Sequence, residues 1–165
     1  LKNLEILDIG SGLCVFLALL KNENAILSCI DPSIESIKHA KNRVGVNYAV
    51  HGDIFELEFD KKYDFISLNK VIEHVKNPLD LLLKSKKLLQ QDGFIYFEVP
   101  DGENAAKNGG YVNREEFYIE HYTIFSDKSI RFLIDRVGLK LNKISRIHEP
   151  SDKYTFCCFI SKIEN

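Results

Sequence analysis

Short apolar runs alternate with helical patterns along the first part of the chain. Leu4–Ile9 predicts a strand, and the apolar residues of Leu13–Lys21 predict a helix after it. Ala25–Ile30 predicts a second strand, and Pro32 suits the first turn of a helix that continues toward Arg43. This order is typical of a parallel sheet, because parallel strands need crossover connections.

The alternation continues to position 100, and the rest of the chain departs from it. We expect three more strands and one more helix in the regular part: Val46–Val50, Tyr63–Leu68 and Phe94–Val99, and a helix over Leu79–Leu89 that Pro78 opens and Gln91–Gly93 closes. Residues 101–116 are rich in glycine and asparagine, which predicts a long loop. Ser126 is a candidate N-cap for a helix ending at Gly138. Leu139–Ile147 and Tyr154–Ile163 predict two strands joined by a short turn.

These elements predict an α/β fold with a doubly wound, Rossmann-like sheet of about seven strands. We expect the first five strands to be parallel and covered by helices on both faces, and the last two to form an antiparallel pair. No repeat or linker divides the chain, so one domain over residues 1–165 is expected. The chain opens on Leu1 and contains no methionine, so we also expect native residues before Leu1.

The amino-acid composition disfavours some classes of binding partner for this domain. Of the 165 residues, 45% are hydrophobic and 28% are charged, with a net charge of -2. This balance disfavours nucleic acid, whose phosphates attract basic surfaces. The longest apolar stretch, Leu13–Leu20, is too short to cross a membrane, and the four cysteines lack the spacing of a metal site. We expect a cytoplasmic protein without a nucleic-acid or membrane partner, and the sequence does not indicate its oligomeric state.

The turn after the first strand has the residues of a ligand-binding site. Residues 8–12 read DIGSG, and glycine permits positive φ or a close ligand approach. In doubly wound sheets ligands bind beyond the carboxyl ends of the strands at this point, and the following helix N-terminus can receive a carboxylate. Asp31 ends the second strand about twenty positions after Gly10, where a carboxylate can accept hydrogen bonds from ribose hydroxyls. These features favour a ligand that contains adenosine.

Two positions distinguish between adenosine ligands. The dinucleotide pattern GxGxxG requires glycine where Val15 stands, so NAD is less well supported. Asp8, directly before the turn, is better explained by a ligand with a cationic amino group nearby. A protein that binds NAD or another nucleotide remains the alternative.

Several segments resemble class I S-adenosylmethionine-dependent methyltransferases. Residues 4–14 (LEILDIGSGLC) are similar to the family's first motif, a hydrophobic strand followed by D/E-x-G-x-G-x-G, with Cys14 in place of the third glycine. Residues 52–54 (GDI), 63–69 (YDFISLN) and 71–78 (VIEHVKNP) with 88–93 continue the resemblance, the last especially to the ubiquinone-biosynthesis branch. The resemblance implies S-adenosylmethionine as cofactor, bound by Asp8, Gly10, Ser11, Gly12, Asp31, Pro32, Asp53, Ile54 and Asn69.

The same resemblance implies methyl transfer to a small-molecule acceptor, such as a sugar or a quinone-like metabolite. Residues 119–126 are similar to deoxysugar C-methyltransferases, in which a Glu-His pair is associated with proton abstraction. His121 is therefore the expected general base, since imidazole titrates near neutral pH, and Glu120 is expected to orient it. A histidine that only orders its loop is the alternative, as is a methyltransferase-like scaffold without activity.

A second Glu-His pair, Glu73 and His74, follows the fourth strand. Relatives that methylate oxygen, nitrogen and carbon share this pair, so a structural or cofactor-side role is expected for it. Glu73 and His74 alone are too few to hold a metal ion, and the sequence indicates no further ligands beside them. We therefore expect no metal site.

Overall fold

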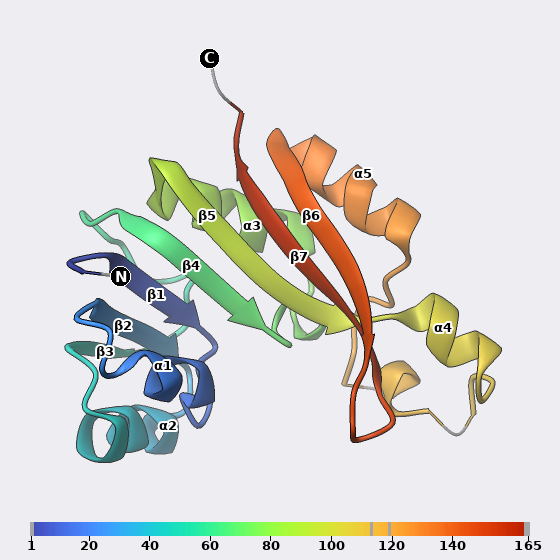
Figure 1. Ribbon diagram of the computed structural model, residues 1–165, viewed down its shortest axis with the longest axis horizontal. Helices are drawn as coiled ribbons and strands as arrows, with labels where there is room; N and C mark the ends of the chain where they lie inside the picture. Colours follow the sequence, from blue (N-terminus) through green and yellow to red (C-terminus); the bar gives the residue numbers. More distant parts are fainter. Residues whose placement is uncertain (1, 113, 119, 164–165) are drawn as a thin grey trace.

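Seven strands of the described residues form one twisted sheet, with helices in most of the connections between the parallel strands (Figure 1). This computed structural model describes residues 2–112, 114–118 and 120–163. The strands are β1 (Glu5–Ile9), β2 (Ile26–Asp31), β3 (Tyr48–His51), β4 (Tyr63–Asn69), β5 (Leu89–Pro100), β6 (Leu139–His148) and β7 (Tyr154–Lys162). The helices are α1 (Val15–Leu20), α2 (Ile34–His39, continued by a π-helix over Ala40–Val44), α3 (Pro78–Leu88), α4 (Gly102–Lys107) and α5 (Asp127–Val137), with 3₁₀ turns at Ile72–His74 and Glu115–Phe117. No helix within these residues has the length and apolarity to cross a membrane.

The strand order confirms the predicted fold class. The sheet runs β3-β2-β1-β4-β5-β7-β6, and the pairs among β1 to β5 are parallel. β7 lies antiparallel between β5 and β6, which confirms the expected C-terminal pair. The order reverses between β1 and β4, so a crevice opens beyond the carboxyl ends of these two strands.

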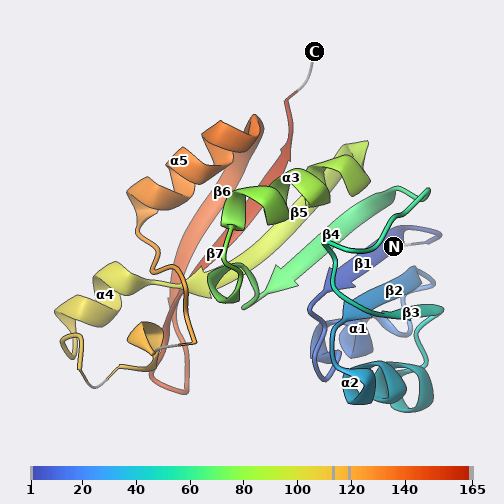
Figure 2. The same ribbon diagram turned by 180° about the vertical axis from the view of Figure 1, so that it is seen from behind.

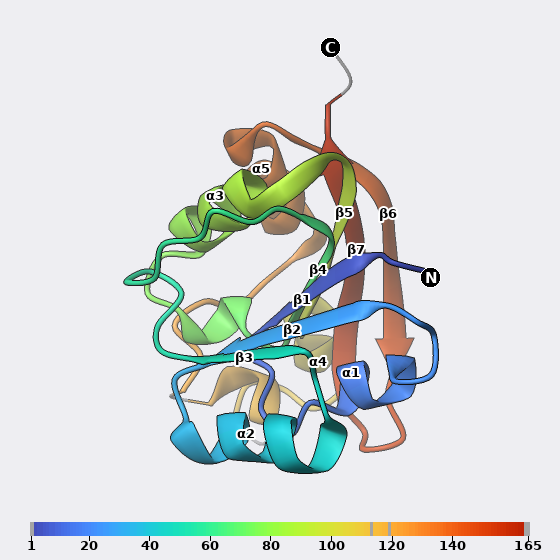
Figure 3. The same ribbon diagram turned by 90° about the vertical axis from the view of Figure 1, so that its left-hand side faces the viewer.

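Buried side chains form one cluster on each face of the sheet. Leu7 belongs to the larger cluster and Ile6 to the smaller one, as alternate side chains of a strand should. α3 and α5 cover the larger cluster over β4 to β7 (Figure 2), whereas α1 lies on the opposite face (Figure 3). All four cysteines are buried free thiols.

The prediction that helices cover both faces is wrong for part of the sheet. On the α1 side, the described residues provide no helix over β5 to β7, and Phe94 and Phe159 are 44% and 36% exposed there. A hollow of about 690 Å³ lies between this surface and α1 and is lined by Phe65 and Tyr96, among others. α3 and α5 both lie on the other face of the sheet, and α1 ends at Leu20 after six residues.

The predicted long loop over residues 101–116 is also wrong, because it contains α4 and a 3₁₀ turn. Asp101 caps α4, since its Oδ1 accepts hydrogen bonds from the N–H groups of Glu103 and Asn104, each at 3.1 Å. The segment Gln91–Gly93 does not close a helix, because β5 already begins at Leu89, which pairs with Tyr63 of β4. The Asp101 cap therefore stabilises a helix in a segment whose composition is typical of a loop. Strand pairing likewise extends β5 through residues that resemble a helix end.

The two faces of β5 allow a matched test of the core. Phe97 is 1% exposed within the larger cluster, whereas Phe94 is 44% exposed on the uncovered face. We expect Phe97→Ala to lower the free energy of unfolding by about 3–5 kcal/mol. Phe94→Ala should lower it by no more than about 1 kcal/mol. Chemical denaturation measures both, and equal losses would contradict this description of the core.

Candidate functional site

The turn between β1 and α1 has the backbone geometry that its glycines predict. Gly10 and Gly12 have φ angles of 69° and 50°, in the left-handed region that favours glycine. A Cβ at Gly10 would lie 2.7 Å from Cγ2 of Val71, so the turn passes close to the segment after β4. Cys14 has a φ angle of 54° although it carries a side chain. The turn thus keeps a left-handed residue at the position of the third motif glycine.

Asp31 connects this turn to the end of β2. Its Oδ2 accepts a hydrogen bond from the Gly12 N–H, and its Oδ1 accepts one from the Ser33 N–H, both at 2.8 Å. The residue is 6% exposed. Because a carboxylate has about four lone-pair sites, Asp31 can still accept hydrogen bonds from two ligand hydroxyls. The expectation that the N-terminus of α1 would bind an anion finds less support, since this Gly12 N–H is already bonded and α1 is short.

A pocket of about 360 Å³, here called the Asp31 pocket, lies beside the turn and at the ends of β1, β2 and β3. It brings together five of the residues that the sequence predicts at a cofactor site: Gly10, Asp31, Pro32, Asp53 and Ile54. Its remaining lining residues are mostly apolar and come from β1, β2, the segments after β3 and β4, and α3: Ile9, Ile30, Gly52, Phe55, Lys70, Val71, His74, Val75 and Leu81. An apolar pocket with carboxylates on one side suits a flat ring that carries a hydroxylated sugar.

Asp8, Ser11 and Asn69 line the hollow on the α1 side instead, and Gly10 borders both cavities. Asp8 is 3% exposed; Ser67 Oγ donates a hydrogen bond to its Oδ1 at 2.5 Å, and Asn69 Nδ2 donates one at 3.5 Å. Burial raises the pKa of Asp8 to about 7 against the lowering effect of these bonds. The sequence did not single out Ser67, whose place opposite Asp8 follows from the β1–β4 pairing.

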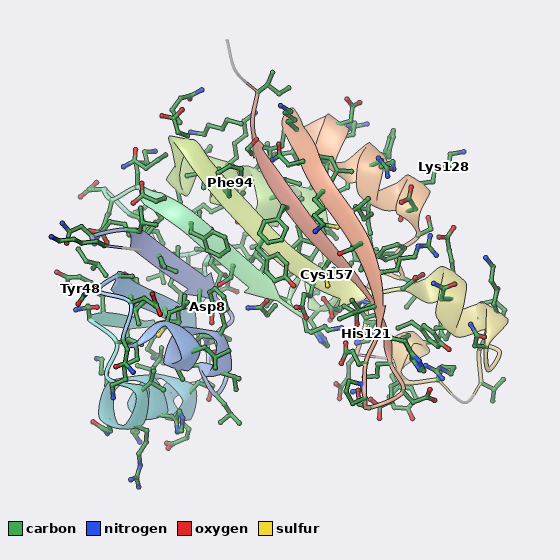
Figure 4. The ribbon with its side chains drawn as sticks, viewed as in Figure 1. Asp8, Tyr48, Phe94, His121, Lys128 and Cys157 are labelled. Atoms are coloured by element: carbon green, nitrogen blue, oxygen red, sulfur yellow. The ribbon has the colours of Figure 1, made fainter. Side chains whose placement is uncertain are left out.

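A second pocket of about 360 Å³ contains both predicted acceptor-side residues, Glu120 and His121. The structure also brings Glu73 and His74 into this His121 pocket from the segment after β4. His74 lines the Asp31 pocket as well, so the two pockets share a wall. In Figure 4, Asp8 and His121 lie on either side of the end of β4.

Backbone hydrogen bonds fix both histidine rings of the His121 pocket. His121 Nδ1 bonds the carbonyl of Glu116 at 2.9 Å, and His74 Nδ1 bonds the carbonyl of Glu120 at 3.1 Å. A carbonyl only accepts, so Nδ1 carries the proton in each ring and the Nε2 lone pair is free when the ring is neutral. The Tyr122 N–H donates to the Glu73 carbonyl at 2.8 Å and joins the two segments. Glu116 was not singled out from the sequence, yet its carbonyl orients His121.

Several cations pair with carboxylates around the pocket. Arg114 binds Glu116 at 2.9 Å, and Lys70 binds Glu149 at 3.0 Å. Glu73 is 1% exposed, and its Oε2 is buried without a hydrogen-bond partner in the described part of the chain. Burial raises the pKa of Glu73 to about 7.

Relatives of the chain are known from sequence. An uncharacterised methyltransferase of Staphylococcus carnosus is 26% identical over 172 residues, which cover 96% of this chain and 78% of the relative. The ubiquinone biosynthesis O-methyltransferase of Rickettsia bellii is 34% identical over 98 residues, which cover 56% of this chain and 40% of that enzyme. The matched stretch is therefore only part of each protein: 56% of this chain and 40% of the Rickettsia enzyme.

Solved structures share the fold. The 1,6-didemethyltoxoflavin-N1-methyltransferase of Burkholderia thailandensis, solved with its substrate and S-adenosylhomocysteine, superposes with a TM-score of 0.78 at 14% identity. The superposition covers 99% of this chain and 72% of that protein. A family model described as a methyltransferase domain matches residues 1–144. With that match over most of its length, the chain belongs to the methyltransferase domain family.

Proposed function

We propose that the protein transfers a methyl group from S-adenosylmethionine to a small-molecule acceptor. The observation that carries the proposal is the Asp31 pocket, in which a buried carboxylate at the end of β2 holds the glycine turn. The membership of the methyltransferase domain family supports the same chemistry.

Each predicted cofactor residue has a proposed part in binding. Asp31 accepts hydrogen bonds from the ribose hydroxyls, while Asp53 and Ile54 border the adenine ring. Pro32 adds apolar surface to the same pocket. On the other side of Gly10, a second group of residues receives the amino-acid end of the cofactor: Asp8, Ser11, Gly12 and Asn69. The bound cofactor supplies a methyl group already activated by its sulfonium, so the protein's main task is to position the acceptor.

The His121 pocket is the proposed acceptor site. His121 has Nδ1 engaged by the Glu116 carbonyl, so its Nε2 is placed to accept a proton from the acceptor. Glu120 lines the same pocket. The wall that His74 shares with the Asp31 pocket brings the acceptor next to the cofactor.

A small acceptor and a cytoplasmic location complete the proposal. The Rickettsia relative is named for ubiquinone biosynthesis, and the Burkholderia structure holds 1,6-didemethyltoxoflavin, which is a small molecule. The pocket volume of about 360 Å³ suits an acceptor of that size. A net charge of -2 disfavours nucleic acid, and four free cysteines fit a reducing compartment.

Calorimetric titration tests the cofactor assignment with a matched pair of variants. The wild-type protein should bind S-adenosylmethionine and S-adenosylhomocysteine but not NADH. We expect Gly10→Ala to weaken S-adenosylhomocysteine binding at least tenfold, because its Cβ would lie 2.7 Å from a methyl group of Val71 at the pocket wall. Gly110→Ala is the control, since Gly110 has a φ angle of 68° and no atom within 4 Å of an added Cβ. Both variants incur a backbone strain of about 1–2 kcal/mol.

Preferential binding of NADH would contradict the assignment. So would a folded Gly10→Ala protein with the affinity of the wild type, since the ligand would then bind elsewhere. Circular dichroism establishes that both variants are folded.

The raised pKa of Asp8 predicts how cofactor affinity depends on pH. Below about pH 7 Asp8 is mostly neutral, so it must lose a proton before it can pair with the amino group of S-adenosylhomocysteine. Affinity should therefore rise with pH up to about 7, by at most about tenfold per unit, and then level off. Asp8→Asn should remove the rise, which separates Asp8 from the neighbouring Cys14, whose pKa is also about 7.

5′-Methylthioadenosine provides the ligand control, because it keeps the adenosine but lacks the amino group. Its affinity should change little over the same pH range. A rise of equal size for both ligands would rule out the pairing of Asp8 with the amino group.

A further inference from the structure

Three side chains of the His121 pocket converge as metal ligands do. Glu73, His74 and His121 each place one potential ligand atom within 4.8 Å of the other two. The rings of His74 and His121 also meet edge to face, with centroids 4.8 Å apart. The sequence separates His121 from the other two residues by more than forty positions, so only the fold completes the set.

The hydrogen bonds of the two rings match those of metal-binding histidines. Such histidines nearly always donate their other ring N–H to a carbonyl or a carboxylate, which fixes the ring and raises its basicity. His121 Nδ1 meets the Glu116 carbonyl and His74 Nδ1 meets the Glu120 carbonyl. The Nε2 lone pairs of both neutral rings are therefore available to a cation.

Glu73 supplies a second, independent observation. Its Oε2 is buried without a hydrogen-bond partner in the described residues, and an ionised carboxylate there is costly unless it is paired or binds a metal. Three other acidic residues of the pocket have basic partners: Arg114 for Glu116, Lys70 for Glu149 and Lys153 for Glu115. None of the ion pairs found among the described residues includes Glu73.

The backbone connects the two segments that carry the ligands. The Tyr122 N–H donates to the Glu73 carbonyl at 2.8 Å, and the ring of His74 bonds the Glu120 carbonyl. These two hydrogen bonds hold the segments together. They leave the Glu73 carboxylate and the Nε2 atoms of both histidines free for a metal ion. His74 is exposed, so the cluster is open to a cation from solution.

We propose that Glu73, His74 and His121 bind one divalent transition-metal ion of the zinc and cobalt class in the His121 pocket. Two imidazoles and one carboxylate suit such ions, whereas magnesium and calcium prefer oxygen ligands. Ligand atoms around tetrahedral zinc lie about 3.4 Å apart, so small side-chain rotations must close the cluster from 4.8 Å.

Three protein ligands leave a coordination position open, as in catalytic zinc sites. Because the His121 pocket is the proposed acceptor site, the open position would be available to the acceptor; this role in catalysis rests on the proposed function. An oxygen or nitrogen atom of the acceptor would bind there and be oriented beside the cofactor. The ion would occupy His121 Nε2, so His121 acts as a ligand in the metal-bound protein and accepts a proton only in the metal-free one.

Cobalt absorption spectroscopy tests the site without an activity assay. Chelator-treated protein is titrated with Co²⁺, and Zn²⁺ or Mg²⁺ is then added as competitor. We expect one equivalent of Co²⁺ with visible d–d bands, displaced by Zn²⁺ and not by Mg²⁺ at equal concentration. Glu73→Gln, His74→Ala and His121→Ala should each weaken Co²⁺ binding at least tenfold. His39→Ala, on α2, is the matched control and should leave it unchanged.

Three results would overturn the proposal: no Co²⁺ binding, Co²⁺ binding unaffected by the three variants, or displacement by Mg²⁺ as readily as by Zn²⁺. A strong thiolate-to-cobalt band would likewise overturn it, because it would place the ion at the cysteines. Circular dichroism checks the folding of every sample, and S-adenosylhomocysteine binding to the wild-type protein separates the two proposals. A wild-type protein that binds S-adenosylhomocysteine but no Co²⁺ overturns only the metal site.

Discussion

The carboxylate of Asp31 accepts backbone hydrogen bonds from both sides of the crevice at the carboxyl ends of β1 and β2. Gly12 donates from the glycine turn and Ser33 from the start of α2, so one buried side chain sets the distance between the two segments. The left-handed turn then brings Gly10 against Val71, beyond β4. The Asp31 pocket exists because these contacts hold three separate connections around the point where the strand order reverses.

The acceptor side depends on a different set of backbone contacts. The segment after β4 and the segment before α5 are bonded to each other through the carbonyls of Glu73 and Glu120. The first segment also lines the Asp31 pocket through Val71 and His74. The same short segment after β4 therefore contributes to both pockets.

The sequence predicts the parts of this structure that local patterns control. The apolar runs and the glycine turn give the parallel strands and the position of the crevice, and the spacing of Gly10 and Asp31 identifies the pocket. α4 was missed because the Asp101 cap had to outweigh a loop-like composition. The partly uncovered face was missed because the apolar pattern of a strand does not reveal whether a helix packs on it. The cluster of His121 with Glu73 and His74 was also not predicted from the sequence. It depends on contacts between segments far apart in the chain, which no local pattern reveals.

We propose that the crevice beside Asp31 holds S-adenosylmethionine with its methyl group directed toward the His121 pocket. A crystal structure of the protein with S-adenosylhomocysteine tests this most directly. We expect ribose hydroxyls on the Asp31 carboxylate, the adenine beside Asp53 and Ile54, and the sulfur at the wall shared by the two pockets. A ligand bound in any other cavity, or bound here with its sulfur turned away from the His121 pocket, would contradict this arrangement.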